Sequence, residues 1–160
     1  MMFTQEQIEQ IKDYLIEVGE DSRVYLGCDS QKYRKGNTWY ARYTVVLVVH
    51  INNLHGCKIF GYTDVERDYD QVDKPRMRLM NEVYKVSELY LTLAEELEDR
   101  EVEIHLDVNP KKEYASSAVV KQAIGYILGV CNIQPKIKPD AFAASYAADA
   151  GVRGRWEMTK

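Results

Sequence analysis

The stretch RVYLGCDSQ, residues 23–31, decides the fold and raises the question of function. Its alternating apolar residues Val24, Leu26 and Cys28 predict a strand with one buried face. Asp29 stands at the end of this strand, directly before a polar segment. A carboxylate in that place is either a turn residue that ends the strand or a ligand for a cation.

Further elements follow from the periodicity of the sequence on both sides of this strand. Thr4 and Gln7 have the spacing of a capping box, so a helix is expected from there to about Glu17. The rest of the chain divides into helices, strands and turns, which are indicated by helical apolar stripes, β-branched residues and turn residues respectively. The expected elements are a first strand 23–29, a turn 31–37, strands 38–51 and 57–63, an irregular segment 64–75, a helix 76–98, a strand 102–108, a helix 116–130, a short strand 133–139, an alanine-rich helix from Asp140, and a loosely held tail 152–160.

The order of these elements predicts the fold class. Three strands joined by short turns indicate an antiparallel meander, and the alternating helices and strands that follow add parallel pairing. This order is the ribonuclease-H-like arrangement: an α/β fold with a mixed five-stranded sheet flanked by helices. The length of 160 residues favours one domain over residues 1–160. Topology alone does not fix a function.

Composition narrows the function classes. The net charge of −4 is mild evidence against a nucleic-acid partner, although a nuclease can be acidic when metal ions screen the charge of its substrate. Cys28, Cys57 and Cys131 are too widely spaced for a zinc site and are expected to be free thiols in a reducing compartment. The sequence shows no signal-peptide pattern and no apolar run of about 20 residues. We therefore expect a cytoplasmic protein that does not contact a membrane.

Two aspartates at strand ends form the main functional hypothesis. Asp29 ends the first strand and Asp107 ends the fourth. If these strands are neighbours, both carboxylates lie at one rim, where they would repel unless a cation lies between them. Oxygen ligands suit Mg²⁺ or Mn²⁺. The alternative is that each aspartate is only a turn residue, and His105 is expected to be a packing residue rather than a ligand.

Four further charged residues are candidates. Asp140 precedes an apolar helix, so it is a helix N-cap, a metal ligand, or both. Glu82 lies in the first turns of the helix 76–98 and is either a solvated surface residue or a ligand. Lys136 and Lys138 alternate along the chain and either hold a phosphate backbone or solvate an edge strand.

Three motifs occur in order along the chain: GCDSQ at 27–31, EIHLDVNP at 103–110 and KIKPDAFAASYA at 136–147. Together they resemble the YkuK-like family of bacterial proteins, which are predicted to be ribonuclease-H-like. The resemblance spans about residues 23–147. It implies that the site acids are Asp29, Asp107 and Asp140.

The helix that begins near residue 76 resembles the family motif but differs from ribonucleases H at one position. RLMNEV at 78–83 is similar to the helix motif of the family and implies Glu82 as a fourth acid. Ribonucleases H often show a pattern like RMELM at this helix start. The similar RMRLM at 76–80 places Arg78 where their glutamate would be. An arginine there competes for the acids or contacts phosphate.

These observations predict a divalent-metal-dependent nuclease that hydrolyses phosphodiester bonds by a two-metal mechanism. Asp29 would bridge two Mg²⁺ or Mn²⁺ ions about 4 Å apart. The partner would be nucleic acid, with DNA, RNA and hybrid all open. The alternative is a catalytically inactive ribonuclease-H-like module that binds nucleic acid, a nucleotide or a protein. The predicted catalytic and metal-binding residues are Asp29, Glu82, Asp107 and Asp140, and the predicted nucleic-acid-binding residues are Arg78, Lys136 and Lys138.

Overall fold

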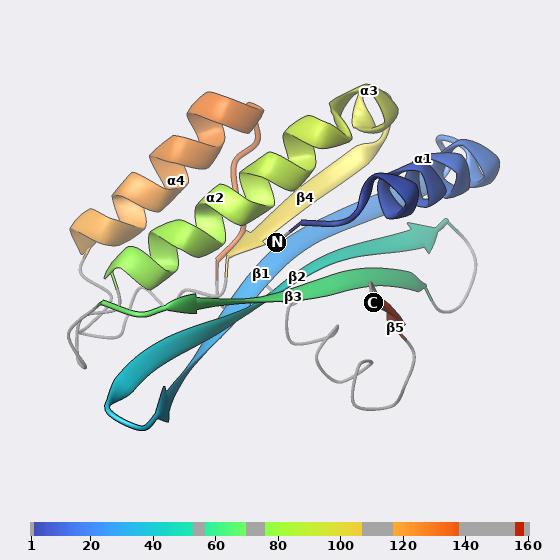
Figure 1. Cartoon of the computed structure of the whole chain (residues 1–160). Coiled ribbons are helices and arrows are strands. Elements are labelled where there is room, and N and C mark those ends of the chain that lie inside the picture. The colour runs from blue at the N-terminus through green and yellow to red at the C-terminus, as the bar shows by residue number, and fades with distance from the viewer. Residues whose placement is uncertain (1, 53–56, 70–75, 107–116, 138–155, 159–160) are drawn as a thin grey trace.

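The computed structural model of the chain describes residues 2–52, 57–69, 76–106, 117–137 and 156–158 (Figure 1). Its strands form one mixed sheet in the order β4-β1-β2-β3-β5. The first three pair antiparallel, β4 runs parallel to β1, and β5 runs parallel to β3. The strands are β1 (Ser22–Lys35), β2 (Thr38–Ile51), β3 (Lys58–Arg67), β4 (Glu101–Leu106) and β5 (Trp156–Met158).

The described helices all cover one face of this sheet (Figure 1). They are α1 (Gln5–Val18), α2 (Arg76–Thr92), α3 (Ala94–Leu97) and α4 (Ser117–Cys131). The expected capping box starts α1, because the Thr4 side chain accepts a hydrogen bond from the Gln7 backbone N–H at 3.2 Å and the Gln7 side chain accepts one from the Thr4 N–H at 2.7 Å. No helix among the described residues is long and apolar enough to cross a membrane.

The main core lies between the helices and the sheet. The predicted inward face of β1, formed by Val24, Leu26 and Cys28, is buried there, as expected from its alternation. Full burial of one aliphatic side chain contributes roughly 1.5–3 kcal/mol to stability. A smaller cluster of Val46, Val48 and Ile59 lies apart from the main core. Both faces of β2 are therefore buried at its centre, which explains its continuous apolar run.

The predicted five-stranded sheet is only partly correct. Four strands have the expected places, but the fifth strand expected at 133–139 is wrong. In that segment, the described residues meet β4 through a single parallel bridge between His105 and Lys136. Pro135 directly precedes Lys136, and a proline cannot donate a hydrogen bond to a strand ladder. The extra strand is the three-residue β5, which lies in the tail that was expected to be loosely held.

The first hairpin is longer than the sequence predicted. β1 continues past Asp29 to Lys35, so the expected turn 31–37 shrinks to the two residues Gly36–Asn37. Gly36 has a φ of 63°, a conformation that favours glycine. Cross-strand aromatic pairing stabilises the extension, because the rings of Tyr33 and Tyr40 stack with centroids 5.7 Å apart.

Two other boundaries also differ. β3 extends to Arg67, into the segment expected to be irregular, because two of its acidic side chains are paired with a lysine of α2. The helix expected over 76–98 is two helices, α2 and α3, separated by Leu93 with φ −107° and ψ 11°. The helix expected from Asp140 lies outside the described residues.

Candidate functional site

The predicted adjacency of the first and fourth strands is confirmed. β1 and β4 pair in parallel from Arg23 opposite Glu101 to Cys28 opposite Leu106. Asp29 is therefore the first residue of β1 beyond the end of β4. Among the other predicted site residues, Asp107, Lys138 and Asp140 lie outside the described residues.

Asp29 is held by regular backbone on its own strand. It lies opposite Thr44 of β2, and its carboxylate accepts a hydrogen bond from the Ser30 backbone N–H at 2.8 Å. The interpretation of Asp29 as a turn residue that ends the strand is wrong, because β1 continues for six residues to Lys35. Since neighbouring strand residues point to opposite faces, Asp29 lies on the face opposite the buried Cys28. The half-buried carboxylate is thus fixed where β1 leaves β4.

Glu82 is a buried residue of α2, with 7% of its surface exposed, so its interpretation as a solvated surface glutamate is wrong. It lies close to β1. Burial raises the pKa of the Cys28 thiol well above its ordinary value, and the negative charge of Glu82 raises it further. The structure therefore brings Glu82 to the residue that directly precedes Asp29. Burying a carboxylate is costly unless hydrogen bonds or a cation compensate its charge.

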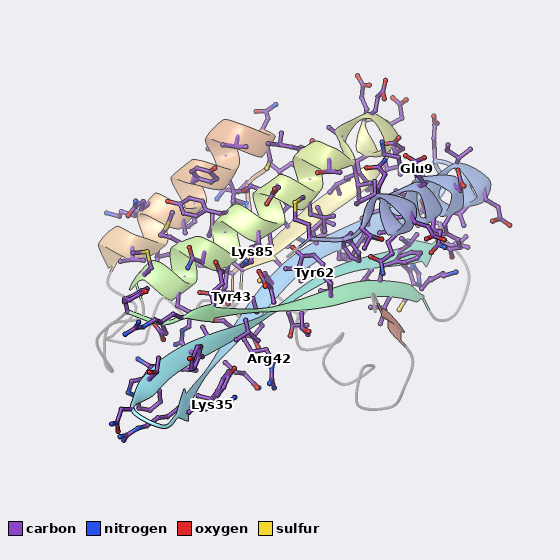
Figure 2. The ribbon with its side chains drawn as sticks, viewed as in Figure 1. Glu9, Lys35, Arg42, Tyr43, Tyr62 and Lys85 are labelled. Atoms are coloured by element: carbon purple, nitrogen blue, oxygen red, sulfur yellow. The ribbon has the colours of Figure 1, made fainter. Side chains whose placement is uncertain are left out.

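A polar cluster beside Glu82 was not found from the sequence. Lys85 of α2 lies 2.9 Å from carboxylate oxygens of both Asp64 and Glu66 on β3, and 4.9 Å from the ring centre of Tyr43 (Figure 2). Although burial opposes the charged form, the hydrogen bonds to the two carboxylates raise the pKa of Lys85. The two-residue spacing of Asp64 and Glu66 was a signal of a shared strand face. The polar composition of residues 64–75 instead predicts an irregular segment.

The two described cationic candidates have different surroundings. Lys136 forms an ion pair with Glu103 of β4, and its side chain is half exposed. Arg78 is half-buried in the first turn of α2. It precedes Glu82 by four residues, so both lie on the same side of the helix. The side chains of Arg78 and Glu82 therefore extend from the same side of α2.

The ligand chemistry of the described acids fits a hard divalent cation. Glu82 lies near Cys28 on the face of the sheet that α2 covers, and Asp29 is the next residue of β1, on the opposite face. Both offer oxygen ligands of the kind that Mg²⁺ and Mn²⁺ prefer. Within the part of the chain that the structure describes, no group of three or more His, Cys, Asp or Glu side chains could hold a metal ion. Two of the four expected ligands, Asp107 and Asp140, lie outside that part.

His105 of β4 is buried, with 2% of its surface exposed, as expected of a packing residue. Its ring lies 5.4 Å from that of Tyr25, and its Nε2 atom lies 3.8 Å from a carboxylate oxygen of Glu103. Burial lowers the pKa of His105. The Glu103 carboxylate opposes this effect, and the Lys136 ammonium adds to it. The neutral imidazole is therefore the form that the folded protein favours.

Stability is expected to fall when the pH drops below the ordinary histidine pKa of 6.5. The unfolded chain then takes up the proton before the folded protein does, so the contribution of His105 is complete above this pH and is lost on acidification. One proton gives a slope of at most about 1.4 kcal/mol per pH unit. Urea unfolding between about pH 8 and pH 5 measures it. His105→Gln should flatten the curve. Identical slopes in the wild type and this variant would contradict the assignment.

Comparison with known proteins adds a family match. The sequence matches the family model described as Ribonuclease H-like over residues 6–152. Among solved structures, "Crystal structure of NurA" is 13% identical over 66% of this chain, with a TM-score of 0.34. "Crystal structure of NurA with manganese" is 13% identical over 72% of this chain, with a TM-score of 0.33. The chain spans 26% and 32% of those two chains, and scores this low do not establish a shared fold. No curated protein matches the sequence.

Proposed function

Because the chain belongs to the ribonuclease H-like family, we propose that it is a divalent-metal-dependent nuclease that hydrolyses phosphodiester bonds. The observation that carries the proposal is the position of Asp29, held on a regular strand directly beyond the last β1–β4 pair. A fixed carboxylate beside the carboxyl end of a parallel strand lies where ligands gather in open α/β sheets. We also propose that the chain is related to the YkuK-like proteins and that it is located in the cytoplasm.

The proposed metal ligands are Asp29, Glu82, Asp107 and Asp140. Asp29 would contribute from the sheet and Glu82 from α2, while Asp107 directly follows the last residue of β4 in sequence. When bound, two Mg²⁺ or Mn²⁺ ions would activate a water molecule and stabilise the leaving oxygen. Glu82 is buried on α2 close to Cys28, the residue before Asp29, and its carboxylate offers the oxygen ligands that Mg²⁺ and Mn²⁺ prefer.

The cationic residues would position the nucleic acid. Arg78 lies one helical turn from Glu82, and its guanidinium offers the paired donors that suit a phosphate. Lys136 and Lys138 follow α4 in sequence, and Lys136 lies beside the carboxyl end of β4. The ion pair between Lys136 and Glu103 would compete with a phosphate at that position.

One observation favours a second candidate, a module that binds nucleic acid, a nucleotide or a protein without cleaving it. Arg78 stands near Glu82, at the position where ribonucleases H resembling this helix start carry a glutamate. A cation there could neutralise Glu82 in place of a metal ion. The two candidates differ in whether a divalent cation supports hydrolysis.

A cleavage screen tests the proposal. Single- and double-stranded DNA, RNA and hybrids are incubated with the folded protein and Mg²⁺, Mn²⁺ or Ca²⁺. We expect cleavage of at least one substrate with Mg²⁺ or Mn²⁺ and poor cleavage with Ca²⁺, whose longer bonds and looser geometry align the reacting atoms less well. Absence of metal-dependent cleavage in every substrate would favour the binding module instead.

A further inference from the structure

The extended end of the β1–β2 hairpin and the adjoining end of β3 carry separate sets of charges on their two faces. The face toward α2 bears Asp64 and Glu66, which pair with Lys85. On the opposite face, the strand register brings together five residues, here called the hairpin face. These residues are Tyr33, Lys35, Tyr40, Arg42 and Arg67.

Among the described residues, the two arginines of the hairpin face have aromatic rather than acidic neighbours. Arg42 and Arg67 are exposed, and within the described part of the chain neither makes an ion pair. Arg42 instead lies over the ring of Tyr33, with 5.3 Å between its guanidinium carbon and the ring centre. Arg67 lies in the same way 5.0 Å from the ring centre of Tyr69, a residue that is 72% exposed. The rings hold the guanidinium groups in place while leaving their charge uncompensated.

Aromatic surface accompanies this charge. Tyr33 and Tyr40 lie directly opposite each other, with ring planes inclined by only 24°, and both remain partly exposed. Arg67 is paired with Tyr40 across β2 and β3. The arrangement alternates basic groups with aromatic rings on an exposed surface, as proteins that bind single-stranded nucleic acid do.

The hairpin face is continuous with Asp29. Asp29 lies on the same face and is opposite Thr44, two residues from Arg42 on β2. Diagonal neighbours of this kind lie about 7–8 Å apart. Side chains on one face of β1 recur roughly every 6.6 Å along the strand. Tyr33 is the second residue after Asp29 on that face. Figure 2 shows Arg42 on the side of the sheet away from α2, and Lys35 toward the hairpin tip.

We propose that the hairpin face binds single-stranded nucleic acid and guides it toward Asp29, with Arg42 and Arg67 on phosphates and Tyr33 and Tyr40 stacked on bases. This inference rests on the proposed function for its direction toward Asp29. An acidic peptide would satisfy the two arginines but would leave the tyrosine pair without a partner. A duplex would present its phosphates but keep its bases stacked in the helix.

Fluorescence anisotropy with a labelled single strand of about 16 nucleotides tests the proposal. EDTA is present, so that binding is measured without cleavage. Arg42→Ala combined with Arg67→Ala should weaken binding at least tenfold and lower the salt-dependence slope by about 1.4, which is about 0.7 for each lost phosphate contact. Lys121→Ala, at an exposed residue of α4, is the control and should bind as the wild type does.

Variants of the two tyrosines distinguish stacking on bases from simple charge attraction. Tyr33→Leu and Tyr40→Leu should each weaken binding about fivefold or more, whereas the phenylalanine variants should retain it. Circular dichroism and thermal melting confirm that each variant is folded. Equal affinity of wild type and arginine variants would overturn the proposal. So would leucine variants that bind as the wild type does, or competition by duplex or polyglutamate as strong as by the single strand.

Failure of the proposed binding face and failure of the proposed nuclease activity give different results. If the wild type binds the single strand through these residues but cleaves nothing with any metal, the proposed nuclease activity fails and the binding face stands. If cleavage depends on Asp29 while the hairpin variants bind and cleave normally, the binding face is overturned and the nuclease stands.

Discussion

Replacing Asp29 with asparagine is expected to abolish metal-dependent cleavage, with a loss of about 10³-fold or more. The isosteric amide retains an oxygen that can accept the hydrogen bond from the Ser30 N–H, so the strand geometry should survive. It loses the negative charge that would hold both cations. The metal ions supply several kcal/mol of transition-state stabilisation, and each 1.36 kcal/mol corresponds to a tenfold change in rate.

Two measurements separate this effect from misfolding. Isothermal titration with Mn²⁺ should show strong weakening in the variant, and thermal melting without metal should show no loss of stability, since removing one acid relieves repulsion. Asp13→Asn, at an exposed aspartate of α1, is the control and should leave metal binding and cleavage unchanged. If Asp29→Asn binds Mn²⁺ as the wild type does, Asp29 is not a ligand.

The second large effect is expected at Glu82. Glu82→Gln should reduce cleavage by about 10²-fold or more and weaken Mn²⁺ binding, because it removes a charged ligand from the metal site. Without metal, the melting temperature should stay close to that of the wild type, since glutamine has nearly the shape of glutamate and fits the same buried position, which is 7% exposed.

The neighbouring helix surface offers the control. Glu88 lies on the same helix but is exposed, so Glu88→Gln should leave cleavage, Mn²⁺ binding and melting temperature unchanged. A large drop in melting temperature for Glu82→Gln, with Mn²⁺ affinity intact, would show that the Glu82 carboxylate stabilises the fold and does not bind metal.

Much of the fold was predictable because its signals are local. The alternation of Val24, Leu26 and Cys28 gave the buried face of β1, and the Thr4 capping box gave the start of α1. The parallel pairing of β1 and β4 followed from the order of elements. These features depend on strand and helix period, which tertiary contacts here reinforce.

The extension of the hairpin was missed because its cause is non-local. The segment after Asp29 is polar, and its strand form depends on cross-strand contacts, such as Tyr33 with Tyr40 and Lys32 over Trp39 at 5.1 Å. The burial of Glu82 was missed for a similar reason. Helical period places it on the more polar flank of the helix, but the packing of α2 on β1 encloses it.

The candidate site could be predicted in part. Sequence reasoning placed Asp29 beside the fourth strand, and the structure confirms that adjacency. It did not find the ion pairs of Lys85 with Asp64 and Glu66, which join α2 to β3 across 19 or more positions of sequence separation. The grouping of Asp29 with Asp107 and Asp140 stays a prediction.

The most direct test of the account is the anomalous scattering of Mn²⁺ soaked into crystals of the protein. We expect a strong anomalous peak within bonding distance of the Asp29 carboxylate, with Glu82 as a second ligand and with the peak lost in crystals of Asp29→Asn. A well-ordered site with no anomalous peak near Asp29 at saturating Mn²⁺ would contradict it.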